Sequence, residues 1–221
     1  MRYPALAELQ RQVLMCRENS RNDINSCCHK VTEYYSAGGH QPLITVPLPE
    51  EIDFPVQILT VGINPRWTEH PAIAQESTPV GQIKGPDTFN KYKETILEGL
   101  PEGAGIAHVE LVQCGTPGGG DVKNVIRICR ERFFDKVVAE LKPKVIVPIG
   151  QWASAHLYWY NTYDGKAGKP WGGIRKRHGT SERVCIGDHE CAIVFTLQPS
   201  ARVSHAEREK ARNRIAEVFS A

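Results

Sequence analysis

The sequence lacks a long apolar run. No window approaches 18 uninterrupted apolar residues, and the first residues, MRYPALAELQRQ, lack the apolar segment of a secretory signal. These absences predict a protein with no membrane partner that works inside the cell, in the cytoplasm. With 221 residues, 41% of them apolar, the chain can bury a sizeable core, and we expect a single domain over 1–221.

The chain also lacks an excess of charge of either sign. The 27 Lys and Arg residues nearly balance the 25 Asp and Glu residues, so the net charge of +2 does not by itself indicate a polyanionic partner. Two short segments are more basic: GGIRKRHG at 172–179 and SARVSHAEREKARNR at 200–214. Contact with a nucleic acid and a solvated surface both explain such segments, and composition leaves the choice open.

The seven cysteines do not form the even set of a secreted disulfide framework, and Cys27 is adjacent to Cys28. In a reducing compartment, cysteines act as core thiols, reactive thiols or metal ligands, and all three roles remain open. Cys185 and Cys191 flank an expected hairpin, which favours a structural role for these two.

Strands alternate with helices along the chain. Short apolar runs rich in β-branched residues predict strands, and apolar residues at every third or fourth position predict helices. We expect strands at 55–62, 106–114 and 144–150 and two more around the turn Gly187-Asp188, and helices at 5–20, 87–100, 122–142, 151–160 and from a Ser204/Glu207 capping box to Phe219.

Several of these strands are continuously apolar, as strands covered on both faces are. The pattern predicts an α/β fold: a three-layer sandwich with a mainly parallel central sheet flanked by helices, preceded by an N-terminal helical and loop extension over 1–54. In such folds ligands bind outside the carboxyl ends of the strands. Three loops follow strands in this way: GINPRW (62–67), CGTPGGG (114–120) and QPSARV (198–203).

In that order, the three loops resemble motifs of the uracil-DNA glycosylase superfamily. VGINP (61–65) is similar to the first catalytic motif in the spelling of the mismatch-specific thymine and uracil branch, and QPSARVS (198–204) resembles the second motif. VELVQCGTPGGG and VIRICRERFFDKVVAELKPKVIVPIGQWA are similar to the iron-sulfur family 4 branch. The resemblance spans residues 55–219 and rests on the order and spacing of short motifs.

The resemblance implies an enzyme that flips a deaminated base, foremost uracil, out of DNA and hydrolyses its N-glycosidic bond, leaving an abasic site. Asn64 would hold the attacking water by positioning it, because an amide is a poor general base. Gln198 stands where the family most often has histidine and would donate a hydrogen bond to the departing base, which is typically worth about 3 kcal/mol. The alternative for Asn64 is an ordinary turn residue after a strand.

Further residues acquire roles from the same resemblance. Gly62 and Ile63, in the first motif, and Phe89 would bind the base; stacking on an aromatic ring is worth about 1–3 kcal/mol. Tyr92 is an alternative to Phe89, and a structural role for either stays open. The second motif, together with the basic segment at 172–179, supplies the expected DNA contacts, which are Pro199, Ser200, Arg202 and Arg175.

Glu110 departs from the family pattern. Family 4 members have a base-reading asparagine at this position, which both accepts from and donates to the uracil edge. A carboxylate only accepts, and a negative charge about 4 Å from the departing base would cost about 4 kcal/mol at an effective dielectric constant of about 20. Glu110 is therefore protonated through burial, points elsewhere, or indicates a substrate other than plain uracil.

The resemblance to family 4 also implies a four-iron [4Fe–4S] cluster. Its ligands would be Cys16, Cys28, Cys114 and Cys129, with Cys27 as the alternative to Cys28, because such clusters are held by four thiolates. The alternative for Cys129 is simple packing on the apolar face of its helix.

Three functions therefore remain open. The first is a monofunctional uracil-DNA glycosylase, acting as a monomer on DNA that contains uracil or another damaged base, inside the cell and with access to DNA. The second is a binder of damaged or abasic DNA with slow or no turnover. The third is a hydrolase of free nucleosides, which the basic segments at 172–179 and 200–214 favour less.

Overall fold

The computed structural model of the chain describes residues 2–19, 41–42, 54–63, 100, 104–115, 123–159, 171–198 and 203–221. They belong to two compact units, which we treat separately. The N-terminal unit comprises Met1–Asp53, Ile63–Ile83 and His108–Glu140, and the sheet unit comprises Phe54–Gly62, Lys84–Ala107 and Leu141–Ala221. The single domain over 1–221 stays a prediction. No helix of the described ranges is long and apolar enough to cross a membrane.

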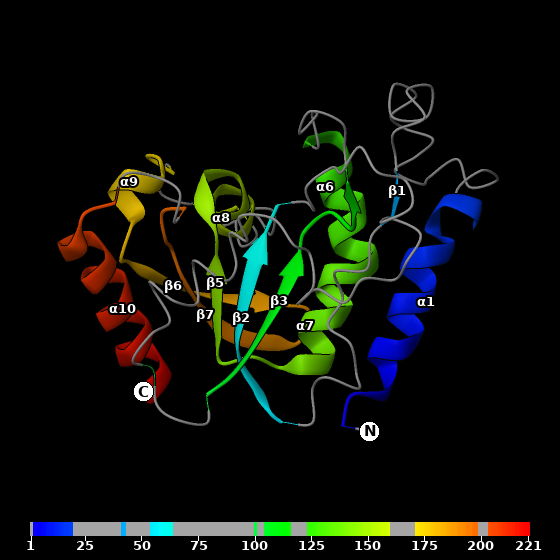
Figure 1. The fold of residues 1–221 in the computed structure, drawn as a ribbon, viewed down its shortest axis with the longest axis horizontal. Coiled ribbons are helices and arrows are strands. Elements are labelled where there is room, and N and C mark those ends of the chain that lie inside the picture. Colours follow the sequence, from blue (N-terminus) through cyan, green and yellow to red (C-terminus); the bar gives the residue numbers. More distant parts are fainter. Residues whose placement is uncertain are drawn as a thin grey trace. The chain divides into compact units, whose positions relative to one another are not determined.

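A five-stranded sheet forms the centre of the sheet unit (Figure 1). β2 pairs with β5 and β5 with β7, in both cases parallel, whereas β6 pairs antiparallel with β7. This confirms the expected α/β fold with a mainly parallel sheet. The spatial order is β3 (Gly105–Glu110), β2 (Val56–Gly62), β5 (Val145–Pro148), β7 (His189–Val194) and β6 (Ser181–Ile186).

The hairpin of β6 and β7 follows the expected turn. Ile186 lies opposite His189, so Gly187 and Asp188 form a two-residue loop. Gly187 has a φ of +59°, the conformation that a type II′ turn requires of its first central residue.

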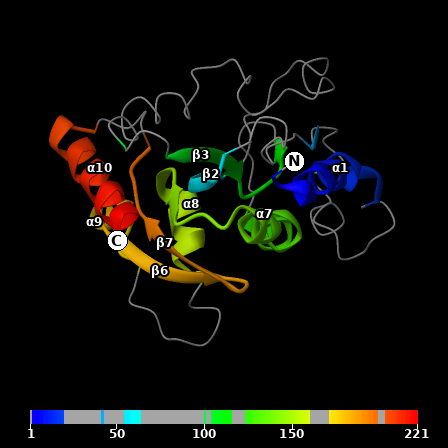
Figure 2. The same ribbon diagram turned by 90° about the horizontal axis from the view of Figure 1, so that it is seen from below.

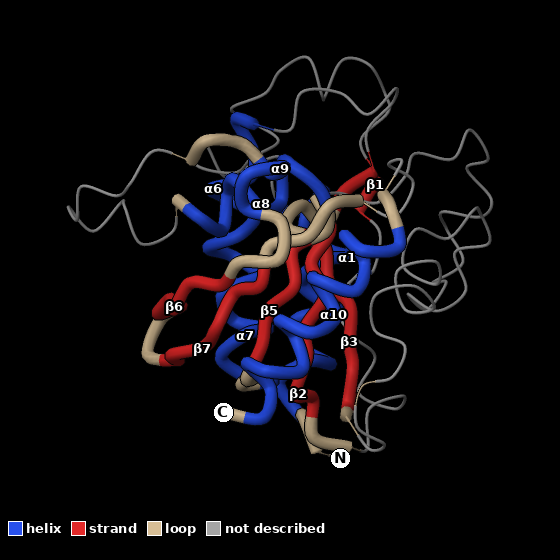
Figure 3. Tube along the Cα trace, turned by 90° about the vertical axis from the view of Figure 1, so that its left-hand side faces the viewer, coloured by secondary structure: helices blue, strands red, loops and turns tan. Residues whose placement is uncertain are grey.

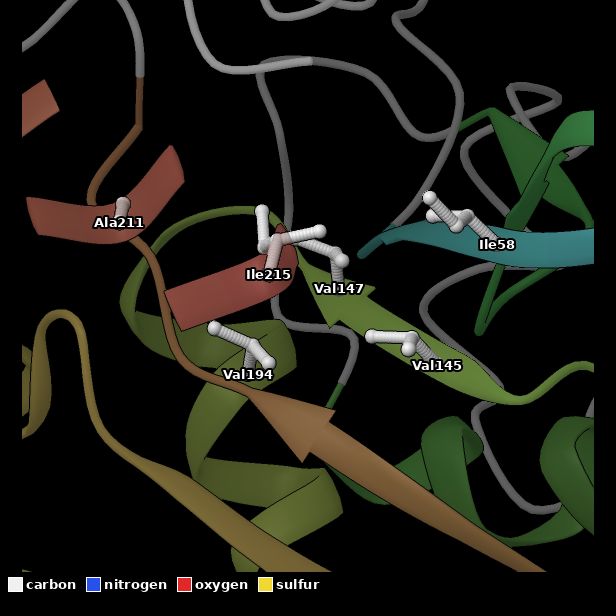
Figure 4. Packing of buried hydrophobic residues seen from close by; sticks show 6 residues of the cluster. All are labelled: Ile58, Val145, Val147, Val194, Ala211 and Ile215. Carbon is white, nitrogen blue, oxygen red and sulfur yellow. The ribbon is translucent and has the colours of Figure 1, made fainter. Parts of the chain in front are cut away.

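Helix α10 (His205–Ser220) covers one face of the sheet (Figure 3). Its Ala211 and Ile215 are fully buried against side chains of three adjacent parallel strands. Figure 4 shows these apolar side chains meeting between helix and sheet. Burying one such aliphatic side chain contributes about 1.5–3 kcal/mol, so this cluster fixes α10 on the sheet. The strand residues of the cluster are Ile58, Val145, Val147 and Val194.

The opposite face is covered through α8 (Gly150–Tyr158) (Figure 2). Phe195 directly follows Val194, and successive residues of an extended chain point to opposite faces. Its ring packs against Tyr158 of α8 at 6.0 Å and against Trp171 at 5.5 Å between centroids. Arg177, at the end of α9 (Ile174–Arg177), stacks on the Tyr158 ring at 4.5 Å, which joins α9 to the same aromatic cluster.

In the N-terminal unit, α1 (Pro4–Asn19) confirms the first expected helix. Leu6, Leu9, Val13 and Cys16 are buried at helical spacing. A short antiparallel pairing joins β1 (Gln41–Pro42) to β4 (Cys114–Gly115).

The helix expected at 122–142 contains a π-helical turn. It consists of α6 (Lys123–Cys129), the π turn η3 (Arg130–Phe134) and α7 (Asp135–Leu141). The wider turn adds a residue to the helix, and the neighbouring pairs Phe133/Phe134 and Val137/Val138 are all buried. The buried face is therefore broader than the single stripe that the helical period predicts.

The prediction of a strand over 106–114 was wrong at its C-terminal end, because β3 stops at Glu110. The side-chain amide of Gln113 donates to the backbone oxygen of Glu110 at 2.6 Å, which closes a turn. Within this turn, Val112 N donates to the backbone oxygen of Ile63, the residue after β2, at 3.0 Å. The buried apolar residues Leu111 and Val112 would fit a longer strand. The local side-chain bond of Gln113 instead competes with extension of the strand beyond Glu110.

The α10 contact is testable by truncation. Ile215→Ala removes a fully buried side chain and should lower the free energy of unfolding by about 2–5 kcal/mol, measured by urea unfolding followed by circular dichroism. Asn213→Ala, at an exposed position of the same helix, is the control and should change it by less than about 0.5 kcal/mol. Equal effects of the two substitutions would contradict this packing.

Candidate functional site

The parallel strands of the sheet unit end at one level. Ile149 N donates to Val61 O at 2.8 Å, which holds the end of β5 to the end of β2. Gly150 N donates to Thr196 O at 3.3 Å, and Ile149 forms a parallel bridge with Thr196 beyond β7. These bonds extend the ladder past the last residues of β5 and β7. We call the border formed by Gly62, Gly150 and Gln198 the carboxyl edge.

Two buried threonines fix the strands just before this edge. Thr60 Oγ1 donates to Ala107 O at 3.1 Å, from β2 to β3. Thr196 Oγ1 donates to Pro148 O at 3.0 Å, from the end of β7 to β5. Both side chains are fully buried, so each bond satisfies a hydroxyl that would otherwise be costly to bury.

Gln198 is exposed at the carboxyl edge, two residues beyond Thr196. Within the described part of the chain, no side-chain or backbone group hydrogen-bonds its amide. Gly150, with a φ of +82°, begins α8 beside it: a Cβ at position 150 would lie 3.5 Å from Gln198 Cβ and 3.6 Å from its Oε1. An exposed amide at this edge has the position expected of a group that hydrogen-bonds a ligand.

The start of α10 lies just beyond the second motif and is capped as expected. Ser204 N donates to Glu207 Oε2 at 2.8 Å, and Glu207 N donates to Ser204 Oγ at 3.3 Å. The bond from the Ser204 backbone, followed by that from its hydroxyl, holds the pKa of Glu207 below its usual range. The charge of Arg175 acts in the same direction, which places this exposed α9 residue within electrostatic reach of the start of α10.

His178 joins α9 to both sides of the second motif. Leu197 N donates to its Nδ1 at 3.1 Å, and its Nε2 lies 2.8 Å from Glu207 O. The ring is only 3% exposed, and this burial lowers the pKa of His178 below its usual value of 6.5. No sequence pattern distinguished His178 from its basic neighbours, because nothing in GGIRKRHG indicates which side chain is buried.

Glu110 lies in the N-terminal unit and contacts His108. Its Oε1 is 3.1 Å from His108 Nε2, and both side chains are mostly buried. The two residues are separated by one position in β3 and so share a face of the strand. This alternation could have indicated the contact from sequence. Any interaction of Glu110 with a base therefore involves a carboxyl group that His108 already orients.

Two of the four cysteines implied by the family resemblance have described side chains. Cys16 and Cys129 are both buried in the N-terminal unit. Gln113 N donates to Cys129 Sγ at 3.2 Å, so the backbone next to Cys114 in the chain lies against this thiol. Within the described ranges, no three His, Cys, Asp or Glu side chains gather as a metal site does. The Cys114 side chain and Cys28 lie outside the described residues.

Cys191 differs from these two. It is buried in β7, and this burial raises the pKa of its thiol to about 12, whereas Cys185 in β6 is exposed. A thiol with such a pKa is a poor nucleophile at neutral pH, which agrees with the structural role expected for Cys191.

Several expected site residues lie outside the described residues, so their roles stay predictions. They are Asn64, Phe89, Pro199, Ser200 and Arg202. Of the first motif, Gly62 is the last residue of β2, and the backbone oxygen of Ile63 accepts the bond from Val112. Thus the sheet unit brings Gly62 and Gln198 to one edge, and Arg175 lies near the start of α10.

Comparison with known proteins adds no family assignment: no protein-family model matches the chain, and no curated protein sequence matches it significantly.

The packing of Gly150 against Gln198 is testable. Gly150→Ala places a Cβ on a backbone with positive φ and should lower the free energy of unfolding by about 1–2 kcal/mol, measured by urea unfolding. It should also shift the NMR resonances of the Gln198 side-chain amide. Gly187→Ala is the matched control, since its φ is also positive and its Cβ would meet nothing within 4 Å. It should lower stability similarly and leave the Gln198 resonances unchanged; a shift in both variants would contradict a local contact.

Proposed function

We propose that this protein is a DNA glycosylase of the uracil-DNA glycosylase type, which excises a deaminated base, foremost uracil. The observation that carries the proposal is that both motif-bearing strands end at the carboxyl edge. β2 ends at Gly62 and leads into the first motif, while the extension of β7 ends at Gln198 and leads into the second. Only β5 lies between β2 and β7.

The fold is compatible with this proposal. In the sheet unit, α10 lies on one face and the aromatic cluster of α8 on the other, as in the three-layer sandwich of that superfamily. Parallel sheets of this kind bind ligands outside the carboxyl ends of their strands, where Gln198 is exposed. The two motifs are thus carried by the part of the fold that is suited to ligand binding.

The proposed chemistry assigns one task to each motif. Asn64 positions a water for attack on the sugar carbon, and the water supplies the oxygen of the new C–O bond as the C–N bond breaks. The base leaves with the bonding electron pair, and a hydrogen bond from the Gln198 amide stabilises its developing negative charge. The proton that the attacking water loses passes to solvent, and the released base anion takes up a proton from solvent. Because both side chains are uncharged amides, neither adds a charge that opposes the cationic sugar of the transition state.

DNA is the proposed partner because a cation, Arg175, lies near the start of α10, which follows the second motif. Arg175 is exposed and its charge acts on Glu207 at the start of α10. A cation in this place suits a phosphate near the flipped nucleotide better than it suits an uncharged free nucleoside. The monomeric state and the cytoplasmic location stay predictions.

The first test is base excision. A duplex with a single uracil is incubated with excess protein and then treated with alkali, which breaks the strand at an abasic site. We expect breaks at uracil, and a roughly hundredfold slower single-turnover rate for Gln198→Ala, because one such hydrogen bond is worth about 3 kcal/mol. Asn64→Ala should also be strongly impaired, and Asn213→Ala should match the wild type.

Other outcomes of this assay would indicate a different function. A gel shift without breaks would indicate a binder of damaged DNA, and release of the base from free uridine would indicate a nucleoside hydrolase. Excision that is unaffected by Gln198→Ala would remove the second motif from the mechanism. An unmodified duplex without uracil serves as the substrate control.

We also propose a four-iron cluster held by Cys16, Cys114, Cys129 and Cys28 or Cys27. The described residues fit such a group in two respects: Cys16 and Cys129 are buried, and Cys129 Sγ accepts a backbone N–H bond, a contact that tunes cluster sulfurs. When bound, the cluster would cross-link the segments that supply its cysteines, and the hydrolytic step proposed above does not use it.

Anaerobic purification tests the cluster. The wild type should be brown and absorb near about 400 nm, as iron-sulfur proteins do. Cys129→Ser should lose the absorbance and the bound iron, whereas the control Cys185→Ser, at an exposed thiol of β6, should keep both. A colourless wild type, or a Cys129→Ser variant that retains its iron, would contradict this ligand set.

A further inference from the structure

We propose that His178 is a positioning residue that sets the place of Gln198 by holding both ends of the segment that carries the second motif. The contacts themselves are independent of the proposed function, whereas their effect on catalysis rests on it. The segment begins after Leu197 and ends in the first turn of α10. His178 is bonded to the backbone at both of these points.

The hydrogen bonds fix the form of the imidazole. Leu197 N–H donates to Nδ1 at 3.1 Å, so Nδ1 carries no proton and acts as the acceptor. Nε2 then carries the proton and donates to Glu207 O at 2.8 Å. One neutral tautomer therefore satisfies both bonds, and neither the other tautomer nor the imidazolium does.

The elements on both sides of the ring are themselves held in place. His178 N donates to Ile174 O at 2.8 Å, and Gly179 N donates to Phe195 O at 2.9 Å, which ties this segment to the end of β7. On the other side, Glu207 belongs to the capping box of α10. His178 thus bridges two anchored backbones, and the position of Gln198, next to Leu197, follows from this bridge.

Protonation would disrupt the bridge. An imidazolium has N–H donors at both nitrogens, so its Nδ1–H would face the Leu197 N–H. The charged residues that act on the ring are Glu207 and Lys210, both on α10. Burial lowers the pKa of His178 most and Lys210 lowers it further, while Glu207 opposes both.

The direction of the pH effect follows from this lowered pKa. As pH falls below about 6.5, the unfolded chain takes up the His178 proton more readily than the folded protein does. Stability is therefore lost as pH falls through this range, and the loss levels off below the pKa of the folded protein. The bridge is complete at neutral and alkaline pH.

Three variants separate the two bonds. His178→Asn keeps an acceptor near the Nδ1 position, His178→Gln keeps a donor near the Nε2 position, and His178→Ala keeps neither. We expect His178→Ala to slow single-turnover excision by at least about tenfold with a smaller change in KM, because misplacing a catalytic group by about 1 Å costs about a hundredfold. His178→Asn should retain the most activity and lose the acid limb of the pH profile.

Val184→Ala is the control for stability alone. Val184 is buried in β6, at the edge of the sheet, so its truncation lowers stability without touching the bridge. At matched fractions of folded protein, Val184→Ala should excise at the wild-type rate. If His178→Ala also did so, the proposal would be overturned.

NMR separates this proposal from the proposed function. In the wild type, the backbone amide of Leu197 and the side-chain amide of Gln198 should shift together over the acidic pH range in which the resonances of the His178 ring itself titrate. Neither should follow that titration in His178→Asn. If the shifts occur but uracil is not excised, the bridge stands and the proposed function fails; if the ring titrates while both amides stay unchanged, the bridge itself is refuted.

Discussion

The candidate site depends on the hydrogen-bonded ladder that brings three parallel strands to one level. Two backbone bonds form it, one from Ile149 to Val61 and one from Gly150 to Thr196. They force the segments after β2 and β7 to leave the sheet from the same border. The buried hydroxyls of Thr60 and Thr196 lock the register just before that border. The place of Gln198 at the carboxyl edge therefore depends on this ladder.

Packing on the two faces of the sheet positions the helices that begin next to the carboxyl edge. α10 is fixed by aliphatic contacts, and its first turn receives the chain from the second motif. α8 begins at Gly150 and is fixed at its other end by aromatic contacts of Tyr158. α10 thus begins where the segment with the second motif ends, and α8 begins beside Gln198. His178 bonds to the backbone of Leu197, before Gln198, and of Glu207 in the first turn of α10.

Much of this fold was predictable from local pattern. β2, β5, α1 and α10 have strong apolar periodicity or a capping box, and all lie within a residue or two of their expected bounds. The end of β3 and the π turn after Cys129 were not predictable in this way. A bond from the Gln113 side chain closes a turn after the strand, and the π turn lies where two adjacent aromatic residues are both buried. Both depend on contacts that sequence spacing does not encode.

For the site, the sequence predicted which residues follow the strands but not what holds them. Gln198 was expected at a strand end, and the structure places it there. The buried state of His178 and the contact of Gly150 with Gln198 depend on residues distant in sequence. His108 was within reach of prediction, since it shares a strand face with Glu110.

The π turn in the N-terminal unit has a consequence for how this helix tolerates changes in length. Each residue of an α-helix rotates the following side chains by about 100°. Because the π turn holds one residue more than an α turn, a single deletion within Arg130–Phe134 would rewind it to regular α-helix and leave α7 at nearly the same rotation, with Val137 and Val138 still on the buried side. A deletion within α6 or α7 would instead rotate the residues that follow it by about 100°, so the π turn is the part of this helix that best tolerates the loss of one residue.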